Sequence, residues 1–150
     1  MVSKKILAIV VAIVVVVAVG VAAFYLLQSL NASFAEAENS INSFLTSVNE
    51  YDIEASWNSM SSDLQSFYGS KSDWNISILD GLKQSSWQAT LTHISSKSVK
   101  TNNGVTTATY VVTLQIIESG EDTRGETYTF NLVKMSDQWK IDYWREGVWD

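Results

Sequence analysis

The single histidine, His93, is the first candidate for chemistry in this sequence. It lies near Leu91 in a segment where apolar and polar residues alternate, so we expect it on the apolar face of a strand. An imidazole in an enclosed site can act as a general base or orient a water molecule. A histidine at a strand edge, or hydrogen-bonded in a core, gives the same pattern more often. His93 is therefore a candidate pocket residue, and we assign no catalytic residue.

Residues that commonly bind metals or act as nucleophiles are scarce. The chain has no cysteine, so a disulfide, a thiolate zinc site and a cysteine nucleophile are excluded together. The carboxylates show no paired spacing, and alternation turns Asp142 in the last predicted strand toward solvent. A catalytic carboxylate needs burial to raise its pKa toward neutrality. We expect no metal site and no cofactor, and a binding role more than catalysis.

Aromatic residues are the most distinctive feature of the chain, which has six tryptophans. Such large apolar side chains normally form core. Trp87, Tyr110 and Tyr128 fall on the apolar side of alternating segments and join the histidine as predicted pocket residues. Trp144 and Trp149 lie on or beyond the polar side of the last strand. They are candidates for an exposed surface that binds a partner, unless they pack against a loop or a helix.

Charge limits the partners that the chain can bind. There are ten lysines and arginines against sixteen aspartates and glutamates. Lys4 and Lys5 precede the hydrophobic run, so the remainder carries eight basic and sixteen acidic residues, a net charge of about −8. A domain this acidic repels phosphate backbones, so nucleic acid is not an expected partner. Solubility and attraction for cations or basic proteins both fit this balance.

The N-terminal segment predicts a membrane anchor. Residues 6–27 read ILAIVVAIVVVVAVGVAAFYLL without a charge. At about 1.5 Å per residue, a helix of this length covers roughly the 30 Å of a hydrocarbon core. Lys4 and Lys5 precede it and Glu36 is the first charge after it, which favours a cytoplasmic N-terminus. We predict a single-pass protein of the cell membrane, with a cytoplasmic tail (1–5), a transmembrane helix (6–28) and an extracytoplasmic domain (29–150).

Two other interpretations of this segment remain open. Small residues near its end could serve a signal peptidase, although the apolar run is longer than a usual signal sequence. A pilin-like subunit also begins with a hydrophobic helix, and such a helix would allow self-association. Outside the membrane, Asn31 and Asn75 begin Asn-X-Ser triplets and are glycosylation candidates.

Residues 33–82 predict helices, and the rest predicts a sheet. Ser33 and Glu36 fit a capping box before a strongly amphipathic stretch, and the sequence leaves open whether 31–33 is a joint or lies within one continuous helix. Shorter helices are expected after Asp52, from Ser62 and over 72–82. From Gln84 the hydrophobic period changes to two, in four runs joined by short connections. This pattern predicts an α+β domain in which helices cover one face of a four-stranded antiparallel sheet.

The order of these elements resembles the nuclear transport factor 2-like superfamily, whose cone-shaped α+β domain is also called cystatin-like. The resemblance rests on the tryptophan-bearing second helix, 52–57, the two long strands, and the ending Ser136-Asp-Gln-Trp-Lys-Ile-Asp-Tyr143. The resemblance implies that the four-stranded sheet is curved. It implies little about activity, because members include isomerases and dehydratases, ligand pockets and membrane-anchored assembly subunits.

These observations favour a membrane-anchored extracytoplasmic module that binds a protein or a small apolar ligand, in a cell-envelope assembly for example. The alternatives are an isomerase- or dehydratase-like enzyme that uses His93 inside the cone, and a pilin-like filament subunit.

Overall fold

The computed structural model describes residues 4–119, 121–122 and 125–147. The chain divides into two compact units, Met1–Ala35 and Glu36–Asp150. Each unit is described by itself below, and the second is called the domain.

Helix α1 runs without a break from Lys4 to Asn49 and contributes to both units. Its apolar side chains from Val14 to Leu30 are exposed, and by length and composition the helix can span a membrane. The sequence left open whether the helix passes through 31–33, and α1 does continue through Ser33, so the capping-box pattern there does not start a helix. A capping box satisfies amides that lack a partner at a helix start, and amides inside a continuous helix already have one. Glu36 instead pairs with Lys134, whose Nζ lies 3.1 Å from its carboxylate.

Short helices follow α1 within the domain. They are α2 (Ile53–Asn58), α3 (Ser62–Tyr68), α4 (Lys71–Trp74), the π-helical turn η1 (Asn75–Leu79) and α5 (Asp80–Gln84). Asp52 caps α2 by accepting from the Ala55 amide, as its sequence position predicts. The cap of α3 is Ser61, one residue before the predicted Ser62, and Gly69 ends this helix with a positive φ of 85°.

The sheet contains β1 (Gln88–Asn102), β2 (Val105–Glu118), β3 (Glu121–Asp122), β4 (Glu126–Met135) and β5 (Gln138–Glu146). Its order is β1-β2-β4-β5, with every pair antiparallel and the short β3 beside β2. Two-residue turns at 103–104 and 136–137 join the outer hairpins, and all four turn residues have a positive φ. The predicted α+β class with a four-stranded meander is confirmed.

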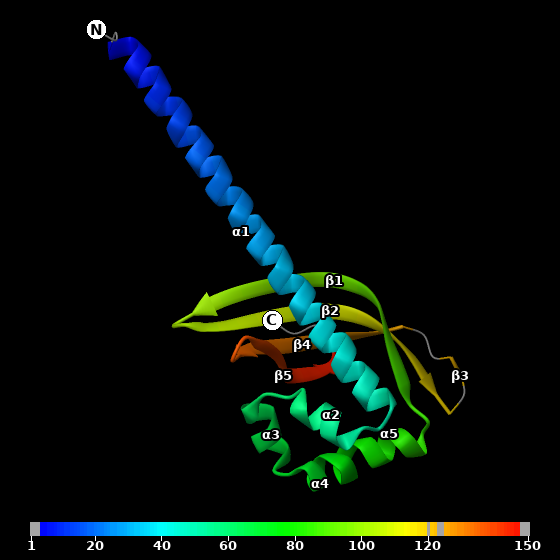
Figure 1. The fold of residues 1–150 in the computed structure, drawn as a ribbon. Coiled ribbons are helices and arrows are strands. Elements are labelled where there is room, and N and C mark those ends of the chain that lie inside the picture. Colours follow the sequence, from blue (N-terminus) through cyan, green and yellow to red (C-terminus); the bar gives the residue numbers. More distant parts are fainter. Residues whose placement is uncertain (1–3, 120, 123–124, 148–150) are drawn as a thin grey trace. The chain divides into compact units, whose positions relative to one another are not determined.

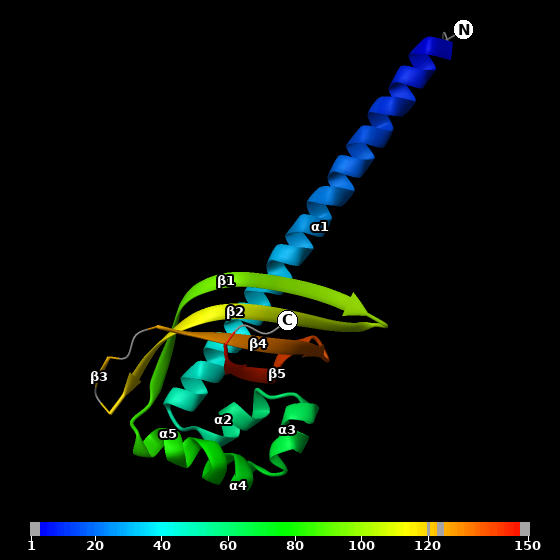
Figure 2. The same cartoon turned by 180° about the vertical axis from the view of Figure 1, so that it is seen from behind.

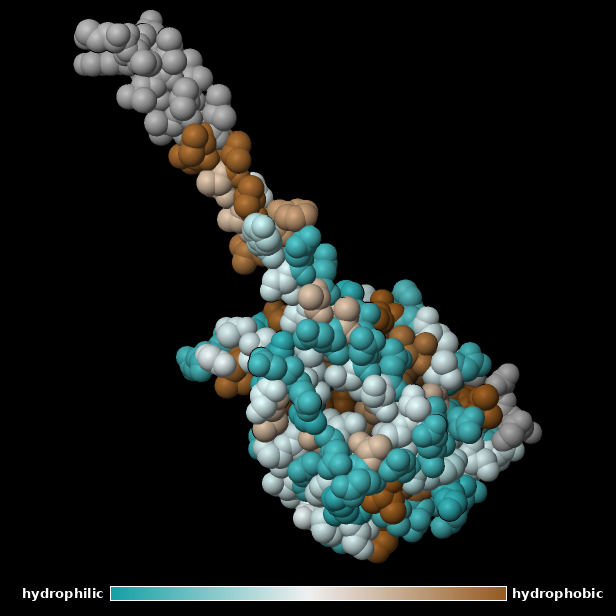
Figure 3. Space-filling view, viewed as in Figure 1, coloured by the Kyte–Doolittle hydropathy of each residue, from teal (hydrophilic) through white to brown (hydrophobic). Residues whose placement is uncertain are grey.

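The domain has a core between the sheet and its helices. Figures 1 and 2 show a bent sheet with the C-terminal part of α1 across one face, and α2 to α5 following one another below β5. The face of the domain seen in Figure 3 is mostly hydrophilic or neutral, with small separate hydrophobic patches. The largest fully buried side chains come from both layers: Trp74, Tyr110, Phe44, Phe130, Ile41, Leu79, Leu114, Leu132, Ile141, Val48 and Val112.

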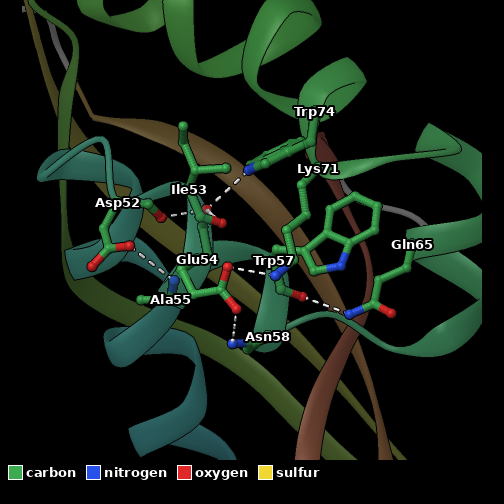
Figure 4. Close-up of polar contacts among 10 residues, drawn as sticks. Asp52, Ile53, Glu54, Ala55, Trp57, Asn58, Gln65, Lys71 and Trp74 are labelled. Carbon is green, nitrogen blue, oxygen red and sulfur yellow. Dashed lines mark hydrogen bonds and ion pairs between the residues drawn. The ribbon is translucent and has the colours of Figure 1, made fainter.

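Polar contacts join α2 to its neighbouring helices (Figure 4). Inside the core, the Trp74 Nε1–H donates to Ser56 Oγ at 2.9 Å, and both side chains are fully buried. Closer to solvent, the Glu54 carboxylate accepts from Lys71 and from Asn58. The buried bond matters most, because an indole N–H without an acceptor in a core loses its hydration without compensation.

We therefore expect Ser56→Ala to destabilise the domain by about 1–3 kcal/mol, since it leaves Trp74 Nε1–H without an acceptor. Urea unfolding of the full-length chain in maltoside micelles, followed by tryptophan fluorescence, measures this change. Ser66→Ala is the matched control, because the Ser66 hydroxyl is exposed and donates only to the Ser62 carbonyl of its own helix. Equal unfolding midpoints for the two variants would contradict the assignment.

Candidate functional site

An extra residue in β5 decides which side chains of this strand face the core. Asn131 of β4 pairs with Tyr143 and Leu132 pairs with Ile141, so Asp142 has no partner across the ladder. Such a bulge reverses the alternation that follows it. Tyr143 is exposed, while Trp144 stacks on Phe130 with ring centroids 6.0 Å apart. Our placement of Trp144 on the polar side of the strand is therefore wrong.

The bulge residue is held by the connection between α2 and α3. Ser61 Oγ donates to Asp142 Oδ1 at 2.6 Å, and the same hydroxyl accepts from the Leu64 amide to cap α3. Ile141 adds two backbone bonds, each 2.8 Å long: its carbonyl accepts from the Ser61 amide and its amide donates to the Ser59 carbonyl. Asp142 is consequently half-buried against α3, although alternation predicted that it faces solvent.

A pocket of about 230 Å³ lies where α3 meets β5, and we call it the α3–β5 pocket. One wall is helical and the other is the strand that carries the bulge. Its lining combines two carboxylates, one leucine and four aromatic rings: Asp63, Leu64, Phe67, Tyr68, Asp142, Tyr143 and Trp144. The rings are held by neighbours, since Tyr68 packs edge-on against Trp74 at 4.8 Å and Trp144 packs edge-on against Phe44 at 5.5 Å.

A second pocket, of about 280 Å³, shares Tyr68 and Trp144 with the first and contains two of the predicted pocket residues, Trp87 and Tyr128. Its remaining lining is Ile78, Leu82, Arg145 and Glu146. A third predicted pocket residue, Tyr110, is fully buried in the core and lines neither of these two pockets. Aromatic rings therefore fill the centre of the fold, and the open space lies at its edges.

The fourth predicted pocket residue, His93, is exposed. A register shift between Leu91 and His93 leaves Thr92 as an extra residue in β1, and His93 pairs with Thr113. Thr113 alternates with the buried Leu114, so His93 lies on the outer face of the sheet. Placing this histidine on the apolar face was wrong, because a bulge reverses the faces of a strand.

Burial raises the pKa values of two phenols at the pockets, Tyr128 and Tyr68. The pKa of Tyr128 is raised to about 12, chiefly by burial and further by the carboxylates of Glu126 and Glu146. Burial also raises the pKa of Tyr68. Both groups stay protonated at neutral pH, so they offer neutral hydroxyl groups next to the pocket carboxylates.

The remaining candidates have varied positions. Among the described residues, no three or more histidine, cysteine or acidic side chains gather as a metal site would require. Asn31 is exposed within α1, and Asn75 is half-buried at the start of η1. Trp149 lies outside the residues that the structure describes.

Sequence reasoning missed most of the α3–β5 pocket. Asp63 and Phe67 lie four residues apart on α3, so they stand above one another on one helix face. That spacing was a readable signal of a mixed acidic and aromatic surface. Tyr143 could not be found in this way, because its exposure depends on the bulge before it.

Titration of Tyr128 predicts a pH dependence of stability. Its pKa of about 12 in the native state exceeds the value of roughly 10 for an unfolded tyrosine. The native state therefore holds the proton more tightly, and this stabilisation is present below about pH 10 and lost as pH rises toward 12. Tyr128→Phe should lose less stability than the wild type across this range, in thermal unfolding monitored by circular dichroism. Tyr143→Phe, at an exposed phenol, is the control, and a Tyr128→Phe curve that follows the wild type would contradict the prediction.

No protein-family model and no curated protein sequence matches the chain. Solved structures do match it. Rv3472, a protein of unknown function from Mycobacterium tuberculosis, is similar with a TM-score of 0.59 and 12% identity over 81% of this chain and 74% of that one. A cystatin-like protein of unknown function from Nostoc punctiforme has a TM-score of 0.54 and 13% identity, over 75% of this chain and 87% of its own.

A nuclear transport factor 2-like protein of unknown function from Shewanella oneidensis has a TM-score of 0.53 and 14% identity, over 76% of this chain and 98% of that chain. Identities this low are informative about fold and carry no activity with them. Beyond its long N-terminal helix, this chain has the cystatin-like α+β fold of the nuclear transport factor 2-like proteins.

Proposed function

We propose that this chain is a single-pass, membrane-anchored binding module whose domain lies on the extracytoplasmic side. The observation that carries the binding role is the α3–β5 pocket, in which rings and carboxylates from two elements meet at an accessible cavity. Pockets that combine apolar walls with a few polar groups are the usual form of ligand sites. The proposed context is an assembly of the cell envelope.

The anchor and its orientation are supported by the first part of the chain. The exposed apolar side chains of α1 from Val14 to Leu30 would be costly in water and favourable in lipid. Lys4 and Lys5 precede this run, and no basic residue follows it before Lys71. The bias favours retention of the N-terminus in the cytoplasm.

The position of His93 does not support the enzyme alternative. It required His93 inside the cone as a base, and this side chain lies on the outer face of β1. A base must reach the proton that it removes, within hydrogen-bonding distance or through one water molecule.

Single introduced cysteines test the topology, because the natural chain has none. In intact cells or spheroplasts, a membrane-impermeant maleimide should label Ser98→Cys, which lies at an exposed position of β1. Ser3→Cys should be labelled only after permeabilisation, and on a protein of full length. Labelling in the reverse pattern would place the domain in the cytoplasm. A mature protein without the Ser3→Cys label would indicate a cleaved signal sequence.

Photo-crosslinking tests the binding role. The Phe67 side chain is 80% exposed and lines the pocket, so p-benzoylphenylalanine at this position should form an adduct of one defined mass in intact cells. The same amino acid at position 98, on β1, should not give this adduct. Mass spectrometry of the purified full-length chain measures both. An identical adduct pattern at the two positions, or none at either, would argue against a ligand at this pocket.

A further inference from the structure

Among the described residues, the lining of the α3–β5 pocket carries acidic side chains and no basic one. Asp63 and Asp142 both line it, and no described lysine or arginine does. Three described lysines pair with other carboxylates: Lys71 with Glu54, Lys97 with Glu38 and Lys134 with Glu36. Asp142 accepts from the Ser61 hydroxyl, which satisfies an oxygen without neutralising the charge. The lining of the pocket is therefore acidic, within an acidic domain, and this favours cations over anions.

The aromatic rings add a second attraction for cations. Phe67, Tyr68 and Trp144 line the pocket beside the two aspartates, and ring faces attract positive charge. Trp144 is fixed by stacking on Phe130 and Tyr128, with centroids 6.0 Å away in each case. A cation already uses this surface, because the Arg145 guanidinium lies 5.2 Å from the centroid of the Tyr143 ring. Arg145 itself is outside the lining of the pocket.

Size and donor chemistry narrow the class of cation. Calcium prefers roughly six to eight oxygen ligands, and two carboxylates among aromatic rings do not provide them. A volume of about 230 Å³ suits a headgroup and not a large ligand. Because most of the wall is aromatic and donates or accepts few hydrogen bonds, it suits a methylated ammonium group, which needs no acceptor for N–H groups.

We propose that the α3–β5 pocket binds a small quaternary ammonium compound, with the methylated nitrogen among Phe67, Tyr68 and Trp144 and its charge facing Asp63 and Asp142. This inference rests on the proposed binding function and names the ligand class. The two carboxylates disfavour an attached anionic group, so the ligand carries a net positive charge. A choline-type solute fits better than the phosphate-bearing headgroup of a lipid.

Calorimetric titration of the full-length chain in maltoside micelles tests the proposal. Choline and tetramethylammonium should bind, and neohexyl alcohol, the uncharged carbon isostere of choline, should bind about tenfold more weakly or less well still. Phosphocholine should also bind more weakly than choline, because its phosphate meets the carboxylates. Equal binding of choline and its isostere, or tighter binding of phosphocholine, would overturn the proposal.

Matched variants locate the site. Phe67→Ala and Asp63→Asn change exposed side chains, and each should raise the dissociation constant for choline about 3- to 10-fold. Asp137→Asn removes the same charge in the exposed turn between β4 and β5 and should leave this constant unchanged. Thermal unfolding midpoints equal to the wild type verify that the variants fold. Variants that all bind like the wild type would overturn the site.

Failure here is distinguishable from failure of the proposed function. A domain labelled from outside, with a defined adduct at position 67 but no affinity for any quaternary ammonium probe, overturns this inference and leaves the binding module standing. A domain labelled only after permeabilisation, yet binding choline in a Phe67-dependent way, supports the ligand class and overturns the proposed location.

Discussion

Asp142 occupies β5 without a partner in β4, and the hydroxyl of Ser61 donates to its carboxylate at 2.6 Å. This contact joins the start of α3 to the edge strand, and the flanking backbone bonds of Ile141 reinforce it. The bulge also reverses the faces of the next residues, so that Tyr143 is exposed and the half-buried Trp144 stacks on Phe130 of the core. The bulge and its contact with Ser61 therefore connect the start of α3, the packing of Trp144 and the lining of the α3–β5 pocket.

Filling of the core moves the open space of the domain to its edges. Phe44, Trp74 and Phe130 pack together in the centre. The ring centroid of Phe44 lies 6.4 Å from that of Trp74 and 6.5 Å from that of Phe130. Trp144 completes this cluster and at the same time forms a wall of both edge pockets. Large rings in a close-packed interior leave little room for a ligand. The fold therefore offers a rigid aromatic surface at its margin, which suits recognition of a small group.

The similarity to known structures indicates the fold of the domain, and the residues of the pocket indicate what it can bind. Neighbours at 12–14% identity share the fold and are themselves of unknown function. The same arrangement of helices and sheet carries many activities, so the fold alone does not select one. The local features of this chain are a pair of aspartates beside packed aromatic rings and a helix that can span a membrane.

The sequence by itself determined the features that arise from local or periodic patterns. An uncharged apolar run identified the helix that can span a membrane, and alternation with Asn-Gly and Ser-Asp turns identified the four main strands. Tertiary structure decided the rest. Whether Thr92 and Asp142 become bulges depends on which residues of β2 and β4 they meet, and one extra residue reverses the faces that follow it until another register shift occurs.

The candidate site as a whole could not be predicted from the sequence. Its walls come from α3 and β5, and the contact that joins them links residues 81 positions apart. No periodicity within one segment encodes such a meeting. It exists only after the sheet has formed and the helices have packed against its edge, since a long-range contact is set by the packing of the whole domain.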